Sequence, residues 1–209
     1  MSLHQLAARV CRTFVEFSGT EMRVVQKGKD GQARHAVTGL DERLHDVAAR
    51  FVAENLPGCV LLSEEGEQVS LDASSLQHGE LLIVDPLGGT NNFALGMPGY
   101  GFMAAHLQAG ELSGSVIVLP EHDLYFVVEA GSCRTSLAFT PPASAPSGTT
   151  YYAYPPKLSE AAAAARPAVL SCIDSRTSGV YRSGSAWIGL FNLLSGRPAP
   201  FVGGGGRGW

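Results

Sequence analysis

The stretch Leu81–Phe93, with the sequence LLIVDPLGGTNNF, decides the fold of this 209-residue chain. Its four branched apolar residues predict a buried strand in a sheet that is covered on both faces. Asp85 and the pair Gly88-Gly89 predict that the strand ends in a turn, with Asp85 at its carboxyl end. Gly89 and Thr90 begin a turn or helix whose free N–H groups suit an anion such as phosphate, although a plain strand followed by a glycine turn fits these residues as well.

Two further stretches place carboxylates at the ends of predicted elements. Apolar residues at helical spacing predict a helix over residues 39–57, which Thr38 can cap. Asp41 lies in its first turn, where a carboxylate interacts favourably with the helix dipole. Residues 59–62 predict a short strand that is followed by Glu64 and a second glutamate. Adjacent carboxylates on a loop are, taken alone, typical of a solvated surface.

The remaining pattern divides the chain into two halves. Residues 1–19 carry apolar side chains at helical spacing, which predicts a packing helix, and residues 99–130 predict an antiparallel meander with hairpin-length links. Proline, serine and threonine are frequent in residues 140–150, which predict a linker. We therefore expect an N-terminal α+β half at 1–139, a linker at 140–150 and a smaller α/β half at 151–209, with helices at 159–166 and 185–194 and a strand at 168–173.

The composition is that of a globular protein, with 45% apolar and 16% charged residues. A formal charge of −4 and a pI near 5.8 give no electrostatic footprint for nucleic acid or an anionic membrane. No apolar run is long enough to span a bilayer and no leader pattern opens the chain, so we expect a cytoplasmic protein. The four cysteines form no Cys-x-x-Cys pair, and the apolar surroundings of Cys11 and Cys172 predict buried thiols.

Several of these stretches, in order along nearly the whole chain, resemble the inositol monophosphatase family. The family signature Asp-Pro-(Ile/Leu)-Asp-Gly-Thr-x-Asn-Phe is similar to residues 85–93 at every position but Gly88. The other matches are Val37–Asp41 with Val-Thr-x-x-Asp, Ser63–Gly66 with Gly-Glu-Glu, Arg182–Ala186 with Arg-x-Gly-Ser-Ala, and Gly196-Arg197 with Gly-Arg.

The resemblance implies a layered α+β sandwich and the magnesium-dependent, lithium-sensitive hydrolysis of a small phosphorylated metabolite. It implies that Glu64, Asp85 and the carbonyl of Leu87 hold one Mg²⁺ ion. Thr90 would orient the attacking water, and Glu64 and Asp41 would be the other catalytic residues. The substrate contacts that it implies are Gly89, Thr90, Ser183, Gly184 and Ser185, of which Ser183 or Ser185 equally suits a helix N-cap.

The chain departs from the family pattern where a second metal ion would bind. Gly88 replaces the second aspartate of the signature, and glycine has no side-chain oxygen to offer. After Gly196-Arg197 the family carries an Asp, a Glu and a Trp-Asp pair, whereas this sequence has Ala199, Gly203 and Trp209. The sequence stops where the last metal-binding aspartate would follow. We therefore expect a C-terminally short, incomplete second half, with a glycine run that holds no firm strand, and an impaired two-metal centre.

Three hypotheses remain open at this point. The first is a divergent, pseudoenzyme-like family member that binds a small phosphorylated metabolite and one Mg²⁺, with weak or absent phosphatase activity. The second is the same fold with a different reaction on a small metabolite, in which Glu64, Asp85 or Asp41 acts as acid or base. The third is a non-catalytic subunit of a complete homologue. The resemblance also implies a homodimer.

Overall fold

The computed structural model describes residues 2–17, 25–27, 35–67, 69, 72, 77–136, 149–153, 164, 167–172, 175, 179–181 and 201–203. The chain divides into two compact units. Unit 1 comprises Met1–Lys27 and Ala36–Ala138, and unit 2 comprises Gly28–His35 and Phe139–Trp209. The candidate carboxylates all belong to unit 1.

Unit 1 is built on a six-stranded mixed sheet with the strand order β3-β4-β5-β6-β7-β8. The pair β3·β4 is parallel, and the other neighbouring pairs are antiparallel, which gives the expected meander one additional strand. The strands are β3 (Val60–Ser63), β4 (Glu80–Gly88), β5 (Gly101–Gln108), β6 (Glu111–Leu119), β7 (Leu124–Glu129) and β8 (Ser132–Thr135).

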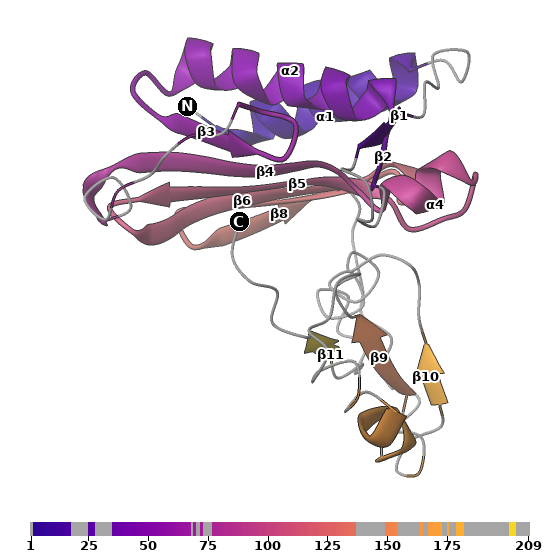
Figure 1. The fold of residues 1–209 in the computed structure, drawn as a ribbon. Coiled ribbons are helices and arrows are strands. Elements are labelled where there is room, and N and C mark those ends of the chain that lie inside the picture. Colours follow the sequence, from indigo (N-terminus) through magenta and orange to yellow (C-terminus); the bar gives the residue numbers. More distant parts are fainter. Residues whose placement is uncertain are drawn as a thin grey trace. The chain divides into compact units, whose positions relative to one another are not determined.

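Two helices, α1 (Leu3–Glu16) and α2 (Gly39–Asn55), lie side by side over one face of this sheet (Figure 1). Both confirm the helical spacing in the sequence, with ends a few residues inside the expected bounds. Their apolar faces and the sheet form one core, in which side chains such as Leu6, Leu44, Phe51, Leu82 and Phe102 are at most 2% exposed. Burial of these side chains supplies most of the stability of the unit.

The start of α1 is fixed to the end of β7. The Ser2 hydroxyl donates to Glu129 Oε2 at 2.6 Å, and the Leu3 amide donates to the other oxygen of the same carboxylate. Beneath this contact, a Cβ at Gly114 would lie 2.7 Å from Leu3 Cδ1, so only glycine allows the helix to approach β6 this closely. The helix layer is therefore held at a defined position on the sheet.

Strand β4 is buried on both faces, because the adjacent residues Leu81 and Leu82 point to opposite faces and are both at most 1% exposed. The expectation that it ends at Asp85 was wrong, since the strand continues to Gly88, with a register shift between Asp85 and Gly88 in its pairing with β5. A bulge accommodates Pro86, which has no N–H to donate within a regular ladder. The carboxylate therefore projects from an irregular part of the strand and not from its end.

The short helix α4 (Thr90–Ala94) follows at once, as the sequence predicted. Gly89 precedes it with a φ of 83°, a left-handed conformation that glycine adopts without strain. Phe93 packs between the rings of Phe17 and Tyr100, with centroid distances of 6.0 and 5.0 Å. The buried amide of Asn92 donates to the carbonyl of Pro98 at 2.9 Å. These contacts fix the helix that carries Thr90.

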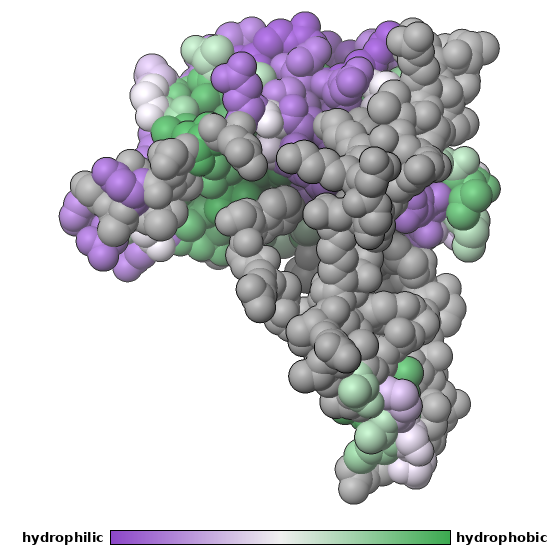
Figure 2. Space-filling model, viewed as in Figure 1, coloured by the Kyte–Doolittle hydropathy of each residue, from purple (hydrophilic) through white to green (hydrophobic). Residues whose placement is uncertain are grey.

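The loop after α4 is apolar and exposed although its backbone is fixed. Figure 2 shows a small hydrophobic patch over α4 and this loop, where Leu95 and Met97 are 72% and 48% exposed. The Met97 amide donates to the carbonyl of Asn92 at 2.7 Å. The patch is therefore part of a defined turn beside Thr90.

Two smaller sheets complete the described part of the chain. β1 (Val25–Lys27) and β2 (His35–Val37) form a two-stranded sheet. In unit 2, β9 (Thr149–Ala153) pairs in parallel with β10 (Gly179–Tyr181) and β11 (Phe201–Gly203). β11 includes the first residue of the glycine run, because Gly203 still pairs with Ala153.

The structure corrects two expectations for unit 2. Residues 167–172 are helical, although their apolar character had predicted a strand. A short apolar run fits either element, and here Pro167 and the preceding alanines favour a helix. Cys172 is exposed and not buried, whereas Cys11 is partly buried as expected. All four cysteines are free thiols, as the sequence indicated.

Candidate functional site

The carboxylates that the sequence singled out come from three elements of unit 1. Asp85 lies in β4, Asp41 lies in the first turn of α2, and Glu64 lies in the turn after β3. Because β3 and β4 are parallel neighbours, their carboxyl ends lie at the same edge of the sheet. The negative charges of Glu64 and Asp41 both raise the pKa of Asp85, so the three carboxylates lie near enough to interact electrostatically.

Thr90 connects this group to β4 and α2. Its hydroxyl lies 2.7 Å from the carbonyl oxygen of Leu87, to which it donates, and 3.3 Å from Asp41 Oδ1. A carbonyl oxygen has two lone pairs, so the bond from Thr90 leaves one of them for another donor or a cation. The structure thus places Thr90, Leu87 and Asp41 in direct contact.

Asp41 is held in place by the residue that caps its helix. Its Oδ2 accepts the Thr38 amide at 2.8 Å and the Thr38 hydroxyl at 2.6 Å. Burial raises the pKa of Asp41, and the hydrogen bonds from Thr38 act in the opposite direction. Asp41 is only 4% exposed. It therefore combines the helix-capping role expected from the sequence with a position beside Thr90.

Asp85 has the most perturbed ionisation at the site. Burial, and then the negative charges of Glu64 and Asp41, raise the pKa of Asp85 to about 7. Among the described residues, no hydrogen bond or positive charge contributes in the opposite direction. Such an arrangement of like charges is unfavourable in the protein alone and becomes favourable when a cation lies among them.

The site contains the types of oxygen group that bind a hard divalent cation. Carboxylate and carbonyl oxygens are the ligands that Mg²⁺ prefers, and Glu64, Asp85 and the Leu87 carbonyl offer three of them. Across the described ranges, no group of three or more His, Cys, Asp or Glu side chains is arranged to hold a metal ion. A site of two carboxylates and one carbonyl suits Mg²⁺, which keeps several of its own waters.

Gly88 is buried in β4 opposite Gly101 and adds no oxygen ligand from a side chain. The expected substrate contacts Ser183, Gly184 and Ser185 lie outside the described residues. Two further residues lie next to the site, and neither was among the site residues predicted from the sequence. His45 follows Asp41 by one helical turn, and Ser63 precedes Glu64. The spacing of four residues from Asp41 to His45 was the signal that could have identified the first.

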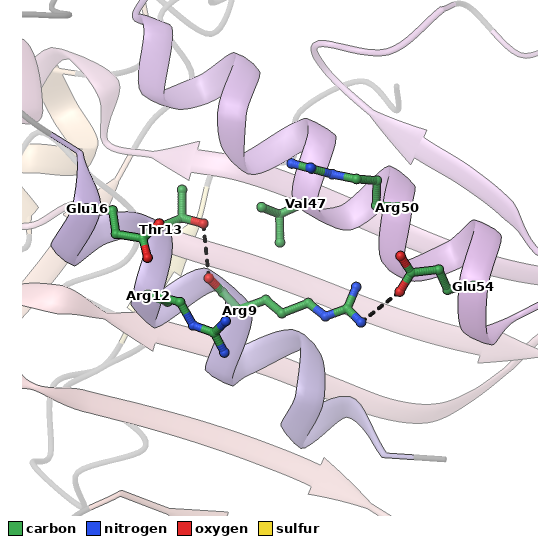
Figure 3. Close-up of a pocket in the computed structure, with 7 residues that line it drawn as sticks. All are labelled: Arg9, Arg12, Thr13, Glu16, Val47, Arg50 and Glu54. Atoms are coloured by element: carbon green, nitrogen blue, oxygen red, sulfur yellow. Dashed lines mark hydrogen bonds and ion pairs between the residues drawn. The ribbon is translucent and has the colours of Figure 1, made fainter.

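A groove between α1 and α2 lies apart from these carboxylates (Figure 3). The Arg9 guanidinium crosses it to Glu54 at 2.7 Å. None of the lining residues belongs to the motifs described above, so we assign the chemistry to the carboxylate site. The groove has a volume of about 410 Å³ and is lined by Arg9, Arg12, Thr13, Glu16, Val47, Arg50 and Glu54.

The structure is a mixed sheet under two helices, with Asp41, Asp85 and Thr90 near the end of the parallel pair β3·β4. A model of the inositol monophosphatase family matches residues 3–204, and the chain belongs to this family. An inositol-1-monophosphatase of Rhizobium meliloti (strain 1021) is 34% identical over 88 residues. That match covers 40% of this chain and 32% of the relative, so it spans about a third of the relative's length.

Solved structures share the fold. The extragenic suppressor protein suhB from Bartonella henselae has a TM-score of 0.73 at 23% identity, over 97% of this chain and 77% of its own. An IMPase/NADP phosphatase complexed with Mg²⁺ and phosphate has a TM-score of 0.68 at 16% identity, over 96% of this chain and 71% of its own. The α+β architecture expected from the sequence is thereby confirmed. Among the described helices, none combines the length and apolarity needed to cross a membrane.

Proposed function

We propose that this protein binds a small phosphorylated metabolite together with one Mg²⁺ ion, and that it hydrolyses the phosphate monoester slowly or not at all. The observation that carries the proposal is Asp85, a largely buried carboxylate whose pKa burial and the negative charges of Glu64 and Asp41 raise to about 7. Membership of the inositol monophosphatase family supports the substrate class. The phosphatase of the same fold that was solved with Mg²⁺ and phosphate supports the metal.

In this proposal, Glu64, Asp85 and the carbonyl oxygen of Leu87 hold the ion. When bound, Mg²⁺ supplies charge neutralisation of the phosphate oxygens and lowers the pKa of bound water. The Thr90 hydroxyl donates to the Leu87 carbonyl at 2.7 Å, and its oxygen accepts a hydrogen bond from the water that it orients. Asp41 Oδ1, at 3.3 Å, is the alternative acceptor for the hydroxyl proton of Thr90. Gly89 and Thr90, with Ser183, Gly184 and Ser185, are the proposed contacts of the substrate.

The weak hydrolysis follows from Gly88. A second cation needs carboxylate oxygens on the other side of Asp85, and glycine supplies none there. If the missing ion removes about 4 kcal/mol of transition-state stabilisation, the rate falls roughly a thousandfold. Ground-state binding of the substrate needs only part of the same contacts, so it is affected less. The homodimer implied by the family resemblance belongs to this proposal and can be checked by light scattering.

The test is a panel of inositol, sugar and nucleotide monophosphates, incubated with the full chain in the presence of Mg²⁺. We expect slow or undetectable phosphate release, together with calorimetric binding of at least one of these compounds that requires Mg²⁺ and is lost in Asp85→Asn. Rapid release would contradict the impaired centre. Turnover of a compound in EDTA would favour a different reaction on this fold, and neither binding nor turnover would favour a non-catalytic subunit.

A further inference from the structure

Two buried polar atoms lie next to the proposed metal site without a hydrogen-bond partner. They are His45 Nδ1 and Ser63 Oγ, and they are the two such side-chain atoms found in the described part of the chain. Leaving a buried polar group unpaired is unfavourable, so a folded protein retains such groups for a reason. Both residues adjoin the turn that carries Glu64.

The imidazole of His45 packs directly against this turn. A Cβ added to Gly66 would lie 3.2 Å from His45 Cε1 and 3.7 Å from Ser63 Cβ, so the side chains of His45 and Ser63 both lie beside Gly66. The Gly66 amide donates to the Ser63 carbonyl at 3.0 Å, which closes the turn around Glu64. His45 therefore supports the turn from the side of α2.

Helix α2 also carries Asp41, one turn before His45, so the two side chains lie on the same face. Asp41 contacts Thr90, and His45 contacts the turn of Glu64. One helix face thus supports both the residue proposed to orient water and a residue proposed to bind metal. A change in either contact would alter the position of the oxygen ligands.

We propose that His45 is a positioning residue for Glu64, and that the Ser63 hydroxyl donates a hydrogen bond to His45 Nδ1 when a divalent cation is bound. The pairing is chemically complementary, because the hydroxyl is a donor and an imidazole nitrogen without a proton is an acceptor. The inference rests on the proposed metal site. The inference extends this site by assigning roles to two residues, His45 and Ser63, that are not themselves metal ligands. Glu64 is exposed and directly follows Ser63, so a shift of Glu64 toward a bound ion would also shift Ser63.

Residues that orient metal ligands typically contribute 10- to 100-fold to metal affinity. Substitutions at His45 can separate hydrogen bonding from packing. Asparagine places a polar atom near the position of Nδ1, whereas glutamine places one near Nε2. We therefore expect His45→Gln and Ser63→Ala each to weaken Mn²⁺ binding about tenfold, and His45→Asn to stay within about threefold of the parent.

The experiment is isothermal titration of the full chain and these variants with Mn²⁺ alone, with melting temperatures recorded to verify folding. The double variant His45→Gln/Ser63→Ala is expected to bind no more weakly than either single variant, because both remove the same bond. Equal affinities of the parent, His45→Gln and Ser63→Ala would overturn the inference, and equal weakening by His45→Asn and His45→Gln would reduce His45 to packing. A parent that binds no Mn²⁺ would contradict the proposed function itself, whereas binding that is unchanged in the variants contradicts only the role of His45.

Discussion

Replacing Gly88 by aspartate is expected to raise Mg²⁺-dependent phosphate release by between tenfold and about a thousandfold. The upper value corresponds to about 4 kcal/mol of transition-state stabilisation from a second cation. Gly88 lies three residues after Asp85, and its φ is not positive, so an L-residue is compatible with the backbone there. The new carboxylate would add the negatively charged ligand that this part of β4 lacks.

The matched control is Gly88→Asn, which has nearly the same size and shape but no charge. We expect Gly88→Asn to raise phosphate release far less than Gly88→Asp, because a second divalent cation needs the charge. Rates would be measured on the same monophosphates with and without Mg²⁺. Equal rates for the parent and Gly88→Asp, in two folded proteins, would show that Gly88 does not limit hydrolysis.

The second large effect concerns Asp85 in the absence of divalent cations. Its pKa of about 7 in the folded protein stands against 3.8 for an ordinary aspartate. Between these values the folded state binds a proton that the unfolded state does not, so stability falls as the pH rises through this window. The stability that the folded state gains by keeping Asp85 protonated is fully present below about pH 4 and fully lost above about pH 7. Its size is at most about 4 kcal/mol.

Asp85→Asn cannot ionise at this position, so it avoids the loss of stability that the parent shows as Asp85 ionises at rising pH. In EDTA at pH 8 we expect the variant to be more stable than the parent by up to about 4 kcal/mol, and at pH 4 we expect the two to be nearly equal. Taking the difference between the two proteins at each pH cancels the titration of groups that do not interact with Asp85. Urea unfolding measures it. A variant that is less stable than the parent at pH 8 would contradict the unfavourable charge cluster around Asp85.

Magnesium should reverse this order. An ion bound by ionised Asp85 stabilises the folded parent by an amount that grows with its concentration, whereas Asp85→Asn lacks the charged ligand. Addition of Mg²⁺ at pH 8 is therefore expected to raise the melting temperature of the parent and to leave that of the variant nearly unchanged.

The main elements of unit 1 could be predicted because local and global signals agree there. The spacing of apolar residues along α1 and α2 and the Thr38–Asp41 capping pattern each specify one element. The motif around Asp85 also identified the metal-site candidates. Pro86 was misleading, because a proline commonly marks the end of a strand. Here it lies in a bulge, and the strand continues to Gly88 through its pairing with β5.

Other features depend on tertiary contacts that no local pattern contains. The strand expected at 168–173 is helical at 167–172, because a short apolar run fits both elements. Likewise His45 has an ordinary position on a helix, and only the fold shows that its ring contacts the turn of Glu64. The raised pKa of Asp85 arises first from burial in the folded core and then from the charges of Glu64 and Asp41, which lie 21 and 44 positions earlier in the chain.

The most direct test of the account is the number of divalent ions that the chain binds. Equilibrium dialysis of the full chain against Mg²⁺ or Mn²⁺, with inorganic phosphate present, would be compared with the same measurement on Asp85→Asn and Gly88→Asp. We predict one ion per chain for the parent, none for Asp85→Asn and two for Gly88→Asp. Two ions bound by the parent, or none, would contradict a single retained metal site.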